Sequence, residues 1–176
     1  LVKNRSNMLE DQEIMKIYNK QPAHQAKHSS CGVIVPGIDT IAVSLANCCR
    51  PIPGDPIIGY ISKGQGVKVH RADCPNIINE KKRLIPVQWE EGLDEKQYEV
   101  NLIIHSDDRN YLLSDIVTTL QQCNVYLKHV DSAVDDGNLE ATTKLTVSVK
   151  NAAHLQNLIS NLKKVRSVNE VIRTIQ

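Results

Sequence analysis

Residues 48–74 read CCRPIPGDPIIGYISKGQGVKVHRADC, and this stretch decides how the first half of the chain is organised. It gathers three thiols and one imidazole, from Cys48, Cys49, His70 and Cys74, in a segment too short to form a domain alone. Cysteine sulfur and histidine nitrogen are ligands that zinc prefers, and four protein ligands in a tetrahedron are typical of a structural zinc site. The spacing therefore predicts a four-ligand metal site.

The spacing of these side chains also sets conditions on the backbone. His70 and Cys74 are four residues apart, so one helical turn starting near His70 would place both on one face. Adjacent side chains of an extended strand point to opposite faces, so the chain must turn or be helical at Cys48 and Cys49 if both are ligands. Asp73, beside Cys74, is an alternative ligand.

Two other interpretations of the cysteines remain open. Free cysteine is often buried, so some of these thiols could belong to an apolar core. Adjacent thiols could also form a redox pair, although a disulfide between neighbours is strained and reactive pairs usually read C-x-x-C. Cys31 and Cys123 lie outside the cluster and are expected to be packed or incidental.

Short runs rich in valine and isoleucine surround the cluster. They read GVIVPG, IAVSLANCC, IIGYIS, GVKVHR and RLIPVQW, and such runs between glycines and prolines predict strands. KGQG at 63–66 predicts a hairpin turn, because its glycines can adopt positive φ. Residues 33–90 are therefore expected to form a small mixed α/β domain with a thin core that a bound metal would stabilise.

Residues 98–176 carry a cleaner pattern. Apolar residues alternate from Tyr98 onward, which predicts a strand, and their spacing of three and four in 112–123 and 152–165 predicts two helices. Further strands are predicted at 124–134, 139–150 and 168–176, with Asp-Asp-Gly-Asn at 135–138 as a hairpin turn. The order βαββαβ is ferredoxin-like, a four-stranded sheet backed by two helices, so the overall class is α+β.

The remaining segments are polar. Residues 91–97 are expected to link the two domains, and residues 1–32 to form a linker with a short helix at 9–18. His24 and His28 are four apart, but Pro22 and the absence of neighbouring thiols favour a solvated linker over a metal pair. The chain opens at Leu1 without an initiator methionine, which suggests a piece of a longer protein.

Composition excludes several classes of function. The net charge is +1, so no global basic field indicates nucleic acid, and no apolar run approaches the roughly 18 residues that a membrane span needs. Five cysteines with no export signal favour reduced thiols in the cytoplasm. No paired carboxylates, phosphate-binding loop or nucleophile with a base accompany the cluster, so we expect no catalysis by this chain.

The pattern CCxPxPGDxIxGxxxxGxGxxxHRxDC, followed by a ferredoxin-like half, resembles the C-terminal regulatory region of the long Rel-type (p)ppGpp synthetase/hydrolases, which control the bacterial stringent response. The resemblance covers about residues 33–176. It implies a zinc-finger-like module, also called the conserved-cysteine or ribosome-intersubunit (RIS) domain, followed by an ACT domain. The zinc ligands of that family fall on Cys48, Cys49, His70 and Cys74. The synthetase and hydrolase domains, with their Mg or Mn, would be absent from this chain.

The resemblance also implies partners, namely the ribosome with its rRNA, an uncharged tRNA, and the N-terminal catalytic domains of the parent protein. Because phosphate contacts need positive charge, Arg50, Lys63, Lys68 and Arg71 are the candidate nucleic-acid-binding residues. The alternative function is an ACT module that senses an amino acid, such as a branched-chain one, or forms a homodimer, and so regulates the parent enzyme.

The predicted ACT half departs from its family in one loop. Many amino-acid-binding ACT domains read D-R-x-G-L-L there, whereas this chain places Tyr111 at the glycine position. The tyrosine could fill the ligand pocket or restrict the loop, since it resists positive φ. Asp108, Arg109, Asn110 and Tyr111 are thus the candidate ligand-binding residues, and the first three could instead cap the following helix or contact a partner.

Overall fold

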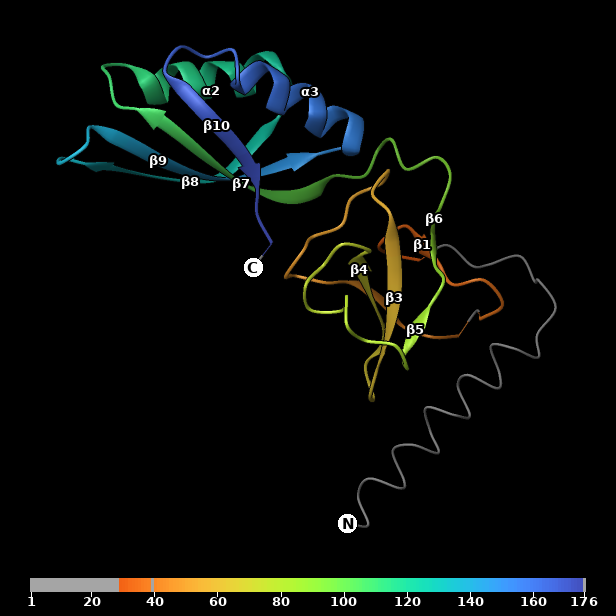
Figure 1. The fold of residues 1–176 in the computed structure, drawn as a ribbon. Helices are drawn as coiled ribbons and strands as arrows, with labels where there is room; N and C mark the ends of the chain where they lie inside the picture. Colours follow the sequence, from red (N-terminus) through yellow and green to blue (C-terminus); the bar gives the residue numbers. More distant parts are fainter. Residues whose placement is uncertain (1–28, 39, 176) are drawn as a thin grey trace. The chain divides into compact units, whose positions relative to one another are not determined.

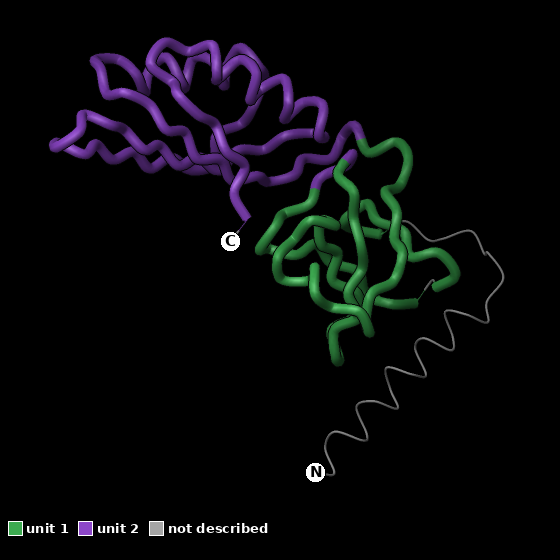
Figure 2. The backbone as a smooth tube through the Cα atoms, in the orientation of Figure 1, with its two compact units in different colours: residues 1–51, 55–93 green, residues 52–54, 94–176 purple. Residues whose placement is uncertain are grey.

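The structure is a computed structural model that describes residues 29–38 and 40–175 (Figure 1). The expected short helix at 9–18, and His24 and His28, lie outside the described residues. The chain divides into two compact units (Figure 2): unit 1 comprises residues 1–51 and 55–93, and unit 2 comprises residues 52–54 and 94–176. Among the described residues, no helix is both long and apolar enough to cross a membrane.

Unit 1 contains two small sheets. The larger has the strand order β2 (Val43–Leu45), β4 (Gly66–Arg71), β3 (Ile57–Ser62) and β5 (Leu84–Ile85). The hairpin of β3 and β4 is antiparallel, and β2 runs parallel to β4. The smaller sheet pairs β1 (Val33–Ile34) with β6 (Gln88–Trp89). All six strands fall within the predicted apolar runs.

The glycines of the β3–β4 turn adopt the conformation that the sequence predicts. Gly64 has φ +69° and Gly66 has φ +81°, both in the left-handed region. A Cβ atom at Gly66 would also collide with the carbonyl oxygen of Ala42, whereas one at Gly64 would meet no atom within 4 Å. Position 66 therefore requires glycine for space as well as for conformation, and the predicted hairpin is confirmed.

The core of unit 1 is small and entirely aliphatic. Its buried side chains are Val33, Val35, Ile38, Ile61, Val67, Val69 and Ile85. A core of this size gives a small domain little stability by itself, so a metal cross-link would contribute appreciably.

Unit 2 is a two-layer α+β domain. Its antiparallel sheet has the order β10 (Val168–Arg173), β7 (Tyr98–Asp107), β9 (Glu140–Val149) and β8 (Tyr126–Asp135). Helices α2 (Leu112–Gln122) and α3 (Ala152–Leu162) both cover one face of that sheet (Figure 1). The order βαββαβ confirms the ferredoxin-like prediction.

The core of unit 2 lies between the helices and the sheet. It includes Leu112, Ile116 and Leu120 of α2, Leu155, Leu158 and Leu162 of α3, and Val100, Leu102, Ile104, Leu145 and Val147 of the strands. The spacing of three and four that predicts α2 also places Leu113 and Val117 on its apolar face, but each of these residues is 41% exposed. A helix that packs on one side of a sheet buries only the residues facing it.

Candidate metal centre

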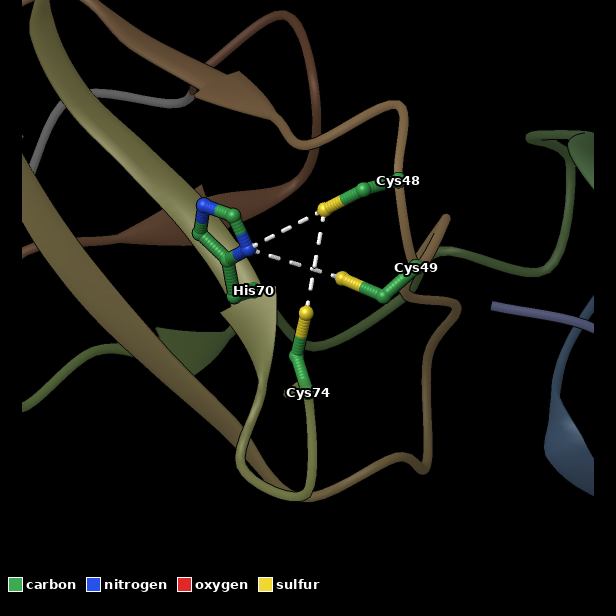
Figure 3. Close-up of side chains that lie close together, drawn as sticks. All are labelled: Cys48, Cys49, His70 and Cys74. Atoms are coloured by element: carbon green, nitrogen blue, oxygen red, sulfur yellow. Dashed lines mark hydrogen bonds between the residues drawn. The ribbon is translucent and has the colours of Figure 1, made fainter. Parts of the chain in front are cut away.

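Two turns and the end of a strand bring the four predicted ligands together (Figure 3). Cys48 and Cys49 lie in a turn after β2, which the Arg50 N–H closes by donating to the Ala46 carbonyl at 3.0 Å. His70 lies near the end of β4, and Cys74 follows in a second turn. One ligand atom from each of the four lies within 4.8 Å of all the others.

The turn expected at Cys48 and Cys49 is confirmed, but the helical turn expected from His70 to Cys74 is wrong. His70 pairs with Ile58 across the β3–β4 ladder, so the backbone there is extended. The chain then reverses, and the Cys74 N–H donates to the Arg71 carbonyl at 3.0 Å. A spacing of four residues therefore reflects a strand followed by a turn.

The distances within the cluster fit zinc. Bonds of about 2.3 Å to sulfur and about 2.0 Å to nitrogen in a tetrahedron place two sulfur atoms about 3.8 Å apart, and sulfur and nitrogen about 3.5 Å apart. Cys48 Sγ lies 3.7 Å from Cys74 Sγ. His70 Nδ1 lies 3.4 Å from Cys48 Sγ and 3.7 Å from Cys49 Sγ. Three thiols and one imidazole are thus arranged as zinc ligands.

Groups outside the four ligands hold them in place. The backbone N–H of Arg71 donates to Cys49 Sγ at 3.3 Å, and the side chain of Asn76 forms a hydrogen bond with Cys48. Sequence reasoning missed both contacts. The first comes from a backbone group that almost any residue supplies, and an asparagine two residues after Cys74 carries no distinctive signal.

Asp73 is not part of the cluster. Its carboxylate accepts a hydrogen bond from the Arg71 guanidinium at 2.6 Å, and its side chain is 62% exposed. The alternative ligand suggested by its position therefore forms a surface ion pair.

The protonation of the ligands differs from site to site. Burial raises the pKa of Cys49 to about 12, and burial also raises the pKa of Cys74. Burial acts in the same direction at Cys48, but hydrogen bonds from Asn76, Cys74 and Cys49 outweigh it, so the pKa of Cys48 lies below its usual value. Burial and the charge of Lys68 lower the pKa of His70 and keep the imidazole neutral at pH 7, the form that binds metals. Cys49 and Cys74 must lose protons when a metal binds.

The other two cysteines are packed, as expected. Cys31 is half-buried against the core of unit 1, and Cys123 is buried at the end of α2.

The four candidate phosphate-contacting residues have different surroundings. Lys63 is exposed at the tip of the β3–β4 hairpin, and Lys68 is half-buried on β4. Arg71 is paired with Asp73, and Arg50 is half-buried beside Cys49 with φ +40°.

The structure also places a second basic run near the hairpin. Lys81, Lys82 and Arg83 immediately precede β5, and the Arg83 carbonyl accepts a hydrogen bond from the Ile61 N–H at 2.9 Å. This run therefore lies beside the end of β3, the strand that leads into the turn containing Lys63. Sequence reasoning missed it, because the pairing of β3 with β5 is not visible in local spacing.

The loop between β7 and α2 differs from the expectation. Arg109 forms an ion pair with Asp115 at 2.5 Å and donates to the Arg166 carbonyl at 3.1 Å. No side-chain hydrogen bond caps α2, so the suggested capping by Asp108, Arg109 and Asn110 is wrong.

Tyr111 has φ 65°, and its side chain is 82% exposed. The tyrosine therefore adopts the left-handed backbone, and its ring does not fill a buried pocket.

Comparison with known proteins identifies both units. A family model of the RelA/SpoT RIS domain matches residues 33–90, which contain all four ligands, and a model of the ACT domain matches residues 94–173. A GTP pyrophosphokinase of Haemophilus influenzae is 34% identical over 172 residues, which cover 93% of this chain and 23% of that protein. A bifunctional (p)ppGpp synthase/hydrolase RelA of Mycobacterium tuberculosis is 32% identical over 155 residues, covering 86% and 21%.

A crystal structure of the ACT domain from the GTP pyrophosphokinase of Chlorobium tepidum matches with a TM-score of 0.40 at 24% identity, and covers 44% of this chain and 99% of that one. The chain spans less than a quarter of the length of the two full-length relatives. The RIS and ACT matches follow one another along the chain and together include most of the described residues. The chain therefore belongs to the RelA/SpoT family, as a Rel-type regulatory region made of an RIS domain followed by an ACT domain.

Proposed function

We propose that this chain is the regulatory region of a cytoplasmic (p)ppGpp synthetase/hydrolase, which binds the ribosome and relays amino-acid starvation to catalytic domains elsewhere in the parent protein. The observation that carries this proposal is the cluster of Cys48, Cys49, His70 and Cys74 within the segment matched to the RIS domain. The names of the relatives, GTP pyrophosphokinase and (p)ppGpp synthase/hydrolase, support the activity proposed for the parent.

Zinc would have a structural role in this region. The cluster offers four protein ligands, which is typical of a closed structural site rather than a catalytic one with an open position. The ligands come from the turn after β2, the end of β4 and the turn that follows, so one ion would join three segments around a thin core. Zinc binding would then contribute directly to the folding free energy of unit 1.

Contacts with RNA would use the basic residues of unit 1. Lys63 is exposed and belongs to the same hairpin as Lys68. Phosphate contacts require positive charge but no particular base sequence, which suits binding to rRNA or tRNA backbones. Arg71 is a weaker candidate, because its guanidinium is already paired with Asp73.

Ribosome co-sedimentation across a range of salt concentrations tests this role. Lys63→Glu with Lys68→Glu should weaken pelleting and reduce the slope of log affinity against log salt by about 1.5, since each lost phosphate contact removes roughly 0.7–0.9. Lys150→Glu, at an exposed position in unit 2, is a control for charge. Zinc content should be measured in each variant, because Lys68 lies near His70. Pelleting that matches the wild type at every salt concentration would refute the RNA contacts.

A second function, amino-acid sensing by unit 2, is supported by the conformation of Tyr111. Its left-handed φ is one that glycine adopts readily, and its exposed ring leaves the loop unobstructed. A bound amino acid should stabilise unit 2 by RT ln(1 + [L]/Kd). Calorimetry with valine and isoleucine tests this function, and the absence of saturable heat at millimolar ligand would exclude it.

A further inference from the structure

The three cysteines of the metal cluster differ in their exposure to solvent. Cys49 is 1% exposed and Cys74 is 0% exposed, whereas Cys48 is half-buried. A thiolate is the nucleophilic form of cysteine, and its reactivity also depends on access. Cys48 is therefore the sulfur ligand that a reagent in solvent reaches first.

Each of the three sulfur atoms accepts a hydrogen bond from at least one N–H group. The backbone N–H of Arg71 donates to Cys49 Sγ at 3.3 Å, and the backbone N–H of Asn76 donates to Cys74. Cys48 accepts from the backbone N–H of Cys49 and from the side-chain amide of Asn76. Among these donors, only the Asn76 amide belongs to a side chain, so a substitution can remove it and leave the backbone donors in place.

The turn after Cys74 fixes the position of Asn76. The N–H groups of Ile77 and Ile78 both donate to the Cys74 carbonyl at 3.1 Å. Ile77 is 4% exposed, so its side chain anchors the turn, and Pro75 restricts φ between the ligand and the asparagine. Asn76 therefore serves two ligands, Cys74 through its backbone and Cys48 through its side chain.

A hydrogen bond to a thiolate ligand has two consequences. Three thiolates around one Zn²⁺ ion leave a net negative charge, which N–H donors stabilise. The loss of such an outer contact typically costs about 10–100-fold in metal affinity. The donor also withdraws electron density from the sulfur, so that the thiolate attacks an electrophile more slowly.

We propose that Cys48 is the ligand through which the zinc centre reacts with electrophiles from solvent, and that the Asn76 amide restrains this reaction. The inference rests on the proposed zinc site. With iodoacetamide as the electrophile, a lone pair of the Cys48 sulfur forms a bond to the methylene carbon, the carbon–iodine bond breaks, and iodide leaves. The product is a neutral thioether, which binds zinc poorly, so alkylation opens the site.

Limited alkylation of the full-length, zinc-loaded chain tests the proposal. Tandem mass spectrometry should find Cys48 modified before Cys49 and Cys74, and Asn76→Ala should raise the initial rate at Cys48 about tenfold. Cys31 lies outside the cluster, so its rate should be the same in both proteins and serves as an internal standard. Equal initial rates at the three ligands, or a Cys48 rate unchanged by Asn76→Ala, would overturn the proposal.

Two further variants separate the amide donor from a general effect on the turn. Asn76→Asp keeps the shape of the side chain but replaces the N–H donor with a carboxylate oxygen, so it should accelerate alkylation at least as much as Asn76→Ala. Asn79→Ala is the matched control, because Asn79 is also exposed and lies three residues further along. It should react at the wild-type rate. An effect of Asn79→Ala equal to that of Asn76→Ala would refute a specific role for the amide.

Cobalt substitution measures the action of the amide on the sulfur directly. The sulfur-to-cobalt charge-transfer band should move to lower energy in Asn76→Ala, while the intensity of the ligand-field bands stays tetrahedral. A band unchanged from the wild type would contradict the proposal. A wild-type chain that binds neither zinc nor cobalt would refute the proposed zinc site as well, whereas normal metal binding with an unchanged Cys48 rate would refute the role of Asn76 alone.

Discussion

Replacing Gly66 with alanine should destabilise unit 1 and weaken its metal centre. Gly66 is the first residue of β4, the strand that carries His70. Its φ is +81°, and a Cβ there would collide with the Ala42 carbonyl oxygen. That oxygen accepts the Val67 N–H at 2.8 Å, so the new methyl group would displace the segment before β2 from β4.

The expected loss has two parts. A left-handed backbone costs a residue other than glycine about 1–2 kcal/mol. Displacing the Ala42 carbonyl from its hydrogen bond costs a further ~1–3 kcal/mol, the upper value applying if the oxygen stays buried and unpaired. Gly64→Ala is the matched control, because Gly64 has φ +69° but nothing within 4 Å of a Cβ. The two variants should therefore differ by about 1–3 kcal/mol, the contribution of the Ala42 contact.

Urea unfolding followed by tryptophan fluorescence measures this difference. Trp89 is the chain's single tryptophan and lies on β6, so its emission reports on unit 1. Gly66→Ala should lower the midpoint more than Gly64→Ala without a change in slope. Gly66→Ala should also lose zinc to a chelator sooner than Gly64→Ala does, because β4, which begins at Gly66, positions the ligand His70. Equal loss of stability in the two variants would show that the close approach of Gly66 to Ala42 is unimportant.

The remaining predictions concern proton release and the helix layer of unit 2. Apparent zinc affinity should rise about a hundredfold per pH unit near neutrality, because the raised pKa values of Cys49 and Cys74 keep two protons bound until the metal displaces them. Calorimetric titration with zinc in buffers of different ionisation enthalpy should show that at least two protons are released for each zinc ion bound. A zinc affinity that does not change with pH would contradict this prediction. His154→Ala should cost unit 2 about 1–3 kcal/mol, because it removes the bond from Nε2 to the Cys123 carbonyl at 2.8 Å and the Nδ1 acceptor of the Lys150 N–H. Thermal unfolding followed by circular dichroism should show the lower stability of unit 2, while the unfolding of unit 1 reported by Trp89 fluorescence stays unchanged. A melting temperature of unit 2 equal to that of the wild type would refute this prediction.

The sequence predicts unit 2 well because each of its elements has one buried side. Apolar periods of two and of three to four then mark strands and helices directly. The exposure of Leu113 and Val117 could not be predicted, since it depends on how much of α2 the sheet covers. The edge position of β8 is equally invisible in its own sequence, because strand order is set by pairing across the sheet.

The ligand set of unit 1 is also visible in the sequence, because few residue types bind zinc and four of them lie close together. The backbone conformation between the ligands cannot be predicted from the sequence. The spacing of His70 and Cys74 is compatible with a helix or with a strand and a turn, and only the pairing of His70 with Ile58 decides between them. The Asn76 contact and the approach of Lys81–Arg83 to β3 likewise depend on tertiary structure.

Elemental analysis of the purified chain tests the central claim most directly, namely that Cys48, Cys49, His70 and Cys74 hold one structural zinc ion. The wild-type chain, and a Cys123→Ser control that alters a buried cysteine of unit 2, should each contain about one zinc per chain, whereas Cys74→Ser should contain almost none. Cys74→Ser should also lower the urea midpoint reported by Trp89. Zinc absent from the wild type after reconstitution, or retained equally by Cys74→Ser and Cys123→Ser, would contradict the account.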